Sequence, residues 1–415
     1  MHLKNKIISI QRISLPLLIL VYFIILFFGL YPFNFCPKNN VHFLHGQNGI
    51  QFREGRAFSK YAKCGIAFTP NPIEITSGPP NGTMTIEFFV QPNPGEYSGL
   101  AYILSFYDGK KQEPLIIGQW RSYLVIRSRI DQNESNHPYQ ESGLKNALIT
   151  NQKSLITIVS GKEGTEIYVN GELAKSSSKI SFDPLRHITG QLVLGNSATG
   201  KNPWFGNLFG LSIYNRKLSP EQVKRNYINW TQNEQKIEQE VLSNPFIMYA
   251  FKEQRNSYVY NQVNDKNILI IPKKYKVLKR DILVPFWQID DLDTVLVWDV
   301  VLNILGFIPL GFCTVGYLQQ IKQFKKNVAY FVAVLSGSII SLAIEVIQIY
   351  LPMRYSSSLD LLCNISGTFL GVLLFIFLCR SIMHKAILSC FLGFVHLNFL
   401  VFVILIYFLV YFVSF

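Results

Sequence analysis

Long apolar runs lie at both ends of the chain, and a polar region of short alternating segments separates them. The first run covers residues 13–30, and four more lie at 295–317, 328–350, 359–379 and 386–414. Each run approaches or exceeds the roughly 20 apolar residues that a helix needs to cross a bilayer. The pattern therefore predicts a membrane α-helical bundle of about five spans, with a second domain inserted after the first helix.

The first run has two interpretations. Basic residues precede it at Lys4, Lys6 and Arg12, as in a cleaved signal peptide. Its apolar core is long for a signal peptide, and Tyr31-Pro32-Phe33 follows where a small-x-small cleavage site would be needed. We expect a retained helix.

Basic residues in the short loops predict the orientation of the helices. Clusters at 322–326 and 380–385 join the second span to the third and the fourth to the fifth, whereas the 351–358 loop holds Arg354 as its one basic residue. Because Lys and Arg accumulate on the cytoplasmic side, the N-terminus is expected in the cytoplasm. The inserted domain and the 351–358 loop then face outward from a bacterial cytoplasmic (inner) membrane.

The inserted region, at 41–230, has the pattern of an all-β domain. Residues 83–90, 155–159, 166–169 and 191–194 read as strands between turns. The Asn170-Gly171 pair favours a type I′ hairpin turn. Further along, Ser219 and Pro220 are typical of the cap and first position of a helix. An antiparallel β-sandwich is expected.

Three stretches of this region resemble a known family. They are YVNGEL at 168–173, LVLGN at 192–196 and WFGNLFGLSIYNRKLS at 204–219. They are similar to the closing half of a concanavalin A-like, laminin G type jelly roll. The resemblance implies a domain that binds glycans or proteins through its loops. Gly206 and Gly210 are expected to allow close strand packing.

Ligand-facing candidates in this domain are Trp120, Tyr97, Tyr139 and the acidic loop 131–134. Ordinary surface or core positions are the alternative explanation for all of them. Beyond the domain, residues 231–285 form a connecting segment with a partial β repeat. A partial repeat cannot bury its own apolar face, so it is expected to add strands to the sandwich or to pack beside it.

Polar residues recur at helical spacing in the predicted spans. Each pair at i and i+3 or i+4 lies on one helical face, and all lie toward the outward ends, where Arg354 joins them. The pairs are Asp299 with Asn303, Glu345 with Gln348, and Asp360 with Asn364. They are either a self-satisfied network that joins helices or a polar site for a lipid headgroup or other ligand. Gly367 and Gly371 continue one stripe as a close-packing face.

The same residues carry a second resemblance. DVVLNILGFIPLGF at 299–312, the EVIQ stretch that begins at Glu345, and DLLCNISGT at 360–368 look like the VanZ-like membrane family. The resemblance implies that residues 1–35 and 286–415 form one VanZ-like region interrupted by the sandwich. It also implies a role in glycopeptide (teicoplanin) tolerance, without an established biochemical activity.

Charge and cysteine content narrow the remaining classes. The net charge is +13, and much of the basic excess flanks the apolar segments. No stretch resembles a basic arm or an RNA-binding motif, so no nucleic-acid partner is expected. The six cysteines have no zinc-ligand spacing, and we expect neither a metal nor a cofactor. Cys36 and Cys64 would both lie outside the cytoplasm, where a disulfide between them can persist.

The resulting interpretation is a non-enzymatic cell-envelope protein. Its sandwich would bind a glycan or protein outside the membrane, and its bundle would engage membrane lipid or a lipid-linked cell-wall precursor. The first alternative is a membrane enzyme that uses Glu345 or Asp360 as acid or base. The chain shows no nucleophile arrangement, phosphate loop or HExxH motif that would favour it. A transporter is the second alternative, but no inverted repeat is evident.

Overall fold

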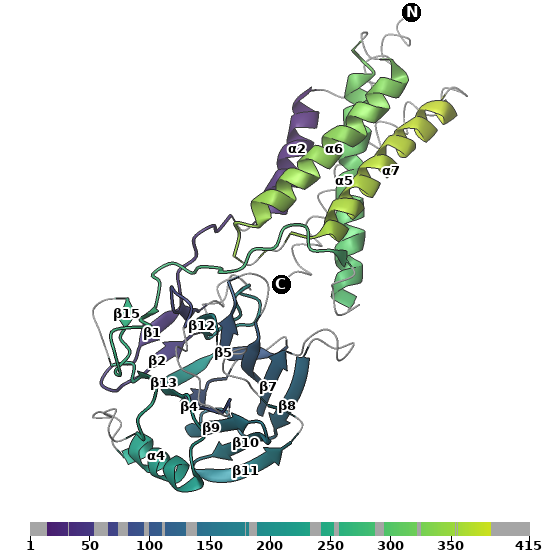
Figure 1. The fold of residues 1–415 in the computed structure, drawn as a ribbon. Helices are drawn as coiled ribbons and strands as arrows, with labels where there is room; N and C mark the ends of the chain where they lie inside the picture. Colours follow the sequence, from purple (N-terminus) through teal and green to yellow (C-terminus); the bar gives the residue numbers. More distant parts are fainter. Residues whose placement is uncertain are drawn as a thin grey trace, which may run out of the picture. The chain divides into compact units, whose positions relative to one another are not determined.

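The computed structural model divides the chain into two compact units. One unit contains residues 1–35 and 280–415, and the other contains residues 36–279 (Figure 1). The structure describes residues 15–31, 33–53, 65–73, 82–94, 99–109, 113–129, 139–178, 180–181, 189–232, 242–252, 257–286, 294–321, 325–352, 354 and 356–382. Cys64, Tyr97, the 131–134 loop and the fifth predicted span at 386–414 lie outside these ranges.

The 36–279 unit is a β-sandwich of two antiparallel sheets, which confirms the predicted all-β fold. The first sheet has the strand order β1-β2-β13-β4-β9-β10-β11, and β14 also pairs with β13. Its strands are β1 (Val41–Phe43), β2 (Ile50–Phe52), β4 (Met84–Pro92), β9 (Ser154–Gly161), β10 (Gly164–Val169), β11 (Glu172–Ser177), β13 (Gly206–Tyr214) and β14 (Ile247–Tyr249).

The second sheet has the order β15-β16-β3-β12-β5-β6-β7-β8. Its strands are β3 (Ala67–Phe68), β5 (Ala101–Tyr107), β6 (Leu115–Trp120), β7 (Tyr123–Arg129), β8 (Tyr139–Leu144), β12 (Gln191–Leu194), β15 (Tyr258–Val259) and β16 (Leu269–Ile270). Strands β14, β15 and β16 come from the 231–285 segment. The partial repeat therefore adds strands to both sheets of the sandwich.

The core of the sandwich lies between the two sheets. Ile86 and Phe88 on β4 face it from one sheet, and Leu124 and Ile126 on β7 face it from the other. All four side chains are fully buried. Because side chains alternate along a strand, the residues between them face outward. This alternation places Arg127 on the outward side of the second sheet.

The predicted turn and helix signals of the sandwich are confirmed. Asn170 and Gly171 both have positive φ, at 53° and 84°, as a type I′ turn requires. Helix α4 (Pro220–Gln232) begins at Pro220, and the Gln222 amide donates to Ser219 Oγ at 3.3 Å. The helix carries Trp230 to the Gly210 backbone, where a Cβ would lie 2.1 Å from the indole. Glycine is thus required at that contact.

The other unit contains four apolar helices among the described residues. They are α2 (Leu15–Leu30), α5 (Thr294–Leu318), α6 (Lys326–Gln348) and α7 (Ser358–Ile382). In the described part of the chain, α5, α6 and α7 are long and apolar enough to cross a membrane, whereas α2 is a shorter apolar helix of 16 residues. Three of the five predicted spans are therefore present as membrane-length helices.

Glycines bring these helices into backbone contact. A Cβ at Gly367 would lie 2.2 Å from the Ile304 carbonyl oxygen, and one at Gly371 would lie 2.1 Å from the Ile308 carbonyl oxygen. From the α5 side, a Cβ at Gly311 would lie 2.0 Å from the Thr368 carbonyl oxygen. The predicted close-packing face of α7 is thus confirmed, and its partner is α5.

Candidate functional site

The polar residues of the helical unit gather where α6 passes into α7. The side chain of Glu345 is buried, and its Oε2 accepts the backbone N–H of Ser357 at 2.7 Å. The Ser356 hydroxyl also bonds to this carboxyl group. Glu345 therefore holds the loop that leads into the next helix.

Ser357 caps the start of α7. Its hydroxyl accepts the Leu359 amide at 3.2 Å and the Asp360 amide at 3.4 Å. Asp360 is the third helical residue, where a capping-box carboxylate would normally accept the N–H of the cap residue. Glu345 already accepts that N–H. The Asp360 carboxyl instead bonds to the Asn303 side chain on α5.

Asp299 lies one turn before Asn303 and interacts electrostatically with Asp360. The side chain of Asp299 is exposed, and those of Asn303 and Asp360 are half-buried. Trp298, next to Asp299, is 58% exposed. Asp299, Asn303 and Asp360 thus form a group at the α5–α7 contact, which we call the carboxylate group.

Gln348 and Arg354 bind the end of α2. Gln348 Nε2 donates to the Gly29 carbonyl oxygen at 2.8 Å, and Arg354 Nη2 donates to the Tyr31 carbonyl oxygen at 3.2 Å. The last carbonyls of a helix have no partner within the helix.

In the described residues no ion pair joins Arg354 to Glu345 or Asp360. Arg354 is instead within electrostatic range of both carboxylates.

Asn364 lies one turn deeper on α7 than Asp360. Its Nδ2 donates to Ser341 Oγ of α6 at 2.9 Å, and its buried Oδ1 has no hydrogen-bond partner among the described residues. Asn364 therefore joins α6 to α7 through half of its amide.

The structure separates the seven candidate residues by what they bind. Glu345 bonds to the α6–α7 loop, Gln348 and Arg354 bond to the end of α2, and Asn364 bonds to Ser341. The carboxylate group differs, because Asp360 bonds to Asn303 within the group and Asp299 is exposed at the surface. The sequence interpretation did not include Ser356 and Ser357, which connect Glu345 to α7. The available signal was the S-x-x-D spacing from Ser357 to Asp360, a capping-box pattern.

The segment that follows the sandwich is attached to the same loop. Val284 forms a parallel bridge with Ser357, and the Leu283 amide donates to Ser356 Oγ at 3.0 Å. The Phe286 amide donates to Ser358 Oγ at 3.1 Å. The connecting segment and the α6–α7 loop therefore form one hydrogen-bonded corner.

The sandwich contains a buried carboxyl group of a different kind. Glu87 on β4 accepts hydrogen bonds from Tyr214 at 2.8 Å, Asn226 at 3.0 Å and Thr157 at 3.2 Å. Burial raises the pKa of Glu87 to about 7, although these hydrogen bonds oppose the shift. The group connects β4, β9, β13 and α4, and it has no exposed member.

Two further sequence predictions concern cysteine and metal. Cys36 is exposed, and its proposed partner Cys64 lies outside the described residues, so the disulfide stays a prediction. No group of three His, Cys, Asp or Glu side chains among the described residues has the arrangement of a metal site.

Comparison with protein families matches both units. Residues 229–380 match the VanZ/LLP1 family, and residues 69–224 match the concanavalin A-like lectin/glucanases superfamily in its laminin G form. The chain thus contains a VanZ-like region and a laminin G type domain, the two families that the sequence resembles; the VanZ/LLP1 match does not extend to residues 1–35. No curated protein matches the chain.

Solved structures share only a distant likeness with the chain. A SAP-like pentraxin from Limulus polyphemus is 16% identical, with a TM-score of 0.32, and the alignment covers 44% of this chain and 82% of the pentraxin. A carbohydrate-binding protein candidate from Bacteroides ovatus is 13% identical, with a TM-score of 0.34 and coverages of 51% and 59%. A sialidase CBM40 domain from Ruminococcus gnavus, bound to sialyllactose, is 14% identical, with a TM-score of 0.30 and coverages of 38% and 96%.

Proposed function

We propose that this protein is a multi-pass protein of the bacterial cytoplasmic membrane that presents a glycan- or protein-binding sandwich outside the cell membrane. The observation that carries the proposal is the joining of a lectin-type domain to a VanZ-like helical region in one chain. The apolar helices anchor the chain in the membrane and hold the sandwich at the envelope surface. Its biological role is in glycopeptide tolerance or cell-surface organisation.

The distribution of basic residues supports the orientation. Lys325 lies between α5 and α6, and Lys326 is the first residue of α6, at the end of these helices opposite to the carboxylate group. The positive-inside rule assigns that end to the cytoplasm. The carboxylate group and the start of the sandwich then belong to the outer face of the membrane.

The second part of the proposal concerns the carboxylate group. In this orientation Asp299, Asn303 and Asp360 lie in the outer halves of their helices. Trp298, next to Asp299 in the sequence, is exposed and is of a residue type enriched at membrane interfaces. Glu345, Gln348, Arg354 and Asn364 position the helices that carry the group. In this proposal the carboxylate group binds a membrane lipid or a lipid-linked cell-wall precursor at headgroup level.

Two measurements test the proposal on the full chain in lipid nanodiscs. Purified cell-wall polysaccharide should be retained by the nanodiscs, and lipid mass spectrometry should find one lipid class that Asp360→Asn loses and Leu370→Ala keeps. Leu370 is an exposed apolar residue of the same helix and is the matched control. If the nanodiscs retained no glycan and no lipid were selectively bound, the proposal would be refuted.

A further inference from the structure

The first and last segments of the sandwich unit pair with each other. Lys38 forms an antiparallel bridge with Lys274. Next to this bridge, the Tyr275 amide donates to the Pro37 carbonyl oxygen at 2.8 Å. All of these residues belong to the 36–279 unit, and the chain continues from both segments into the helical unit. A short strand pair therefore holds together the two points at which the chain enters and leaves the sandwich.

The outward side of this strand pair carries lysines. Lys274 and Lys276 are exposed, whereas Tyr275 between them is 4% exposed. This alternation places Lys274 and Lys276 on the same side. Lys38 is also exposed and shares that side, because residues directly opposite in a strand pair point to the same face. We call Lys38, Lys274 and Lys276 the lysine cluster.

The positive charges of the lysine cluster are not offset within the sandwich. Like charges directly opposite in a strand pair repel and weaken the pairing, as for Lys38 and Lys274. In the part of the chain that the structure describes, no acidic side chain forms an ion pair with the cluster. Lys276 Nζ lies 5.6 Å from the centroid of the Phe68 ring, a contact that involves no anion. A bound anion would relieve this repulsion.

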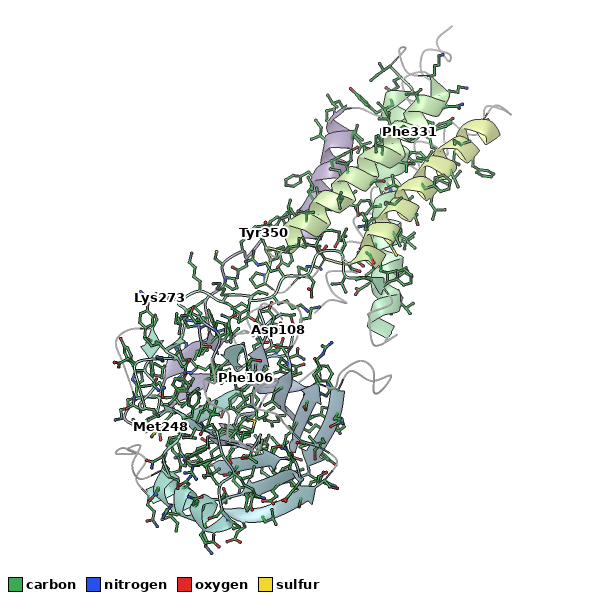
Figure 2. All side chains as sticks on the ribbon, in the orientation of Figure 1. Phe106, Asp108, Met248, Lys273, Phe331 and Tyr350 are labelled. Atoms are coloured by element: carbon green, nitrogen blue, oxygen red, sulfur yellow. The ribbon has the colours of Figure 1, made fainter. Side chains whose placement is uncertain are left out.

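The sequence around the cluster is basic as well. Residues 273–280 contain five basic residues and no acidic one, and Lys273 at the start of this run is labelled in Figure 2. The buried Glu113 interacts electrostatically with Lys279, and Asp281 follows the run. With Lys38 added, the basic residues outnumber these two acidic ones. The surface therefore has a net positive charge.

Exposed apolar residues lie between the cluster and the membrane helices on both connections. Phe33 and Phe35 follow α2, and each is 43% exposed. On the way to α5, Ile282 is 64% exposed and Phe286 is 50% exposed. Outward from the helices, each connection is thus first apolar and then basic. Segments that bind at the boundary between acyl chains and headgroups have the same two kinds of residue.

Arg280 limits the distance between the cluster and the helices. Its guanidinium lies 5.1 Å from the ring centroid of Tyr350, which follows the last residue of α6 by two positions. Lys274 precedes Arg280 by six residues. An extended chain of that length covers at most about 22 Å. Because this end of α6 is the outer end in the proposed orientation, the chain keeps the cluster within reach of the outer headgroups.

We propose that the lysine cluster binds the phosphate groups of anionic phospholipids in the outer leaflet of the membrane. The inference rests on the proposed function, which assigns the sandwich to the outside, and it adds an interaction surface separate from the carboxylate group. Ammonium groups attract anionic headgroups at short range. The exposed apolar residues beside the cluster favour a lipid over a soluble anionic polymer, which has no acyl chains to contact them.

The cluster is compatible with the orientation that the short loops indicate. Long domains cross the membrane largely regardless of their charge, so the basic residues of the sandwich unit do not decide which side it occupies. The attraction between ammonium and phosphate groups is screened by salt. Binding through the cluster should therefore weaken steeply as the salt concentration rises.

The test titrates the full chain in a neutral detergent with short-chain phosphatidylglycerol or phosphatidylcholine, and native mass spectrometry counts the bound lipids. Wild-type protein should prefer phosphatidylglycerol. Replacing all three lysines of the cluster by glutamine should weaken the tightest phosphatidylglycerol site on the order of 100-fold, since each lysine near a headgroup contributes about fivefold. Binding of phosphatidylcholine should not change.

Two further variants separate position and charge from folding. Replacing all three lysines of the cluster by arginine keeps the positive charges and should preserve the preference for phosphatidylglycerol. The matched control removes the same amount of charge elsewhere on the sandwich and should bind phosphatidylglycerol as the wild type does. It replaces three other exposed lysines by glutamine: Lys145, Lys162 and Lys224.

The outcomes distinguish the inference from the proposed function. Equal loss in the matched control would show unspecific attraction and overturn the inference. A loss that Asp360→Asn shares would assign the lipid to the carboxylate group and overturn it as well. A wild-type protein that binds soluble polyphosphate but does not prefer phosphatidylglycerol would refute the lipid partner. If such a protein still retains cell-wall polysaccharide in nanodiscs, the proposed function stands without the lysine cluster.

Discussion

The buried carboxyl groups of the two units differ in their surroundings. In the sandwich, Glu87 on β4 accepts hydrogen bonds from hydroxyl and amide donors on two other strands and one helix, and the network is closed. In the helical unit, Glu345 accepts a hydrogen bond from the loop and interacts electrostatically with the half-buried Asp360, which in turn interacts with the exposed Asp299. A closed network joins elements of a fold, whereas an open one leaves groups available to a ligand.

The packing of the two units also differs. Many side chains lie within the sandwich (Figure 2), and its core consists of buried apolar residues. The α5–α7 contact instead depends on glycines that allow the two backbones to touch. Water drives apolar side chains together in the sandwich. Within lipid that driving force is absent, and close packing takes its place.

The largest effect is expected from breaking that packing. Gly367→Leu places a side chain where the Ile304 carbonyl oxygen lies only 2.2 Å from a Cβ, and backbone cannot move aside as a side chain can. We expect destabilisation of at least about 3 kcal/mol, at the upper end for overpacking. Thermal unfolding of the purified protein in detergent measures it, with Leu370→Ala as the lipid-facing control. A Gly367→Leu variant as stable as that control would contradict the close contact.

The closed network predicts a pH dependence of the sandwich. The pKa of Glu87 is about 7 when folded and 4.5 in its reference state, so the folded chain binds the proton more tightly. The contribution of Glu87 to stability is therefore fully present below pH 4.5 and falls by about 3 kcal/mol as the pH rises through 7. Glu87→Gln should remove this slope. Fluorescence of the buried Trp204 and Trp230 during unfolding reports it, and an unchanged slope would refute the assignment.

The helical corner predicts a smaller loss. Glu345→Ala leaves the Ser357 amide without its acceptor, which costs about 1–3 kcal/mol for a buried group. Glu345→Gln keeps an acceptor oxygen and should cost less. Thermal stability of the two variants, compared in the same detergent, checks the order. Equal stability of Glu345→Ala and wild type would show that the loop does not depend on this bond.

The smallest effect on stability is expected at Asp299, the exposed member of the carboxylate group. Asp299 is exposed, so Asp299→Asn should change stability by less than about 0.5 kcal/mol. The same change should remove the co-purifying lipid, because it deletes a charge of the carboxylate group. Native mass spectrometry measures the lipid. A variant that keeps the lipid but loses stability would make Asp299 a structural residue, like Glu345.

Sequence reasoning reached the fold because its signals are local. Strand alternation, the Asn170-Gly171 turn and the Ser219 cap each depend on a few neighbouring residues, and the glycine stripe of α7 depends on helical spacing alone. It assigned one role to Glu345 and Asp360 because both are carboxylates at helix ends. Their different roles depend on which of them reaches the Ser357 amide, and that is decided by how α6 and α7 meet across the loop.

The surface of the sandwich was only partly foreseeable. Trp120 and Tyr139 stood out as aromatic residues among turns. They lie at the end of β6 and the start of β8, and their role as ligand contacts stays a prediction. The basic run at 273–280 is visible in the sequence, but its pairing with Lys38 is not. That pairing joins distant segments, so a single sequence does not display it.

The orientation of the chain is the most direct test of the central claim that a bundle anchors a sandwich outside the membrane. In a chain without its native cysteines, Leu173→Cys on β11 and Lys325→Cys before α6 each introduce one thiol at an exposed position. A membrane-impermeant maleimide is applied to cells in which the reagent can reach the outer face of the cytoplasmic membrane. It should label Leu173→Cys at once and Lys325→Cys only after the membrane is permeabilised. Labelling of Lys325→Cys in intact cells, with Leu173→Cys protected, would contradict the account.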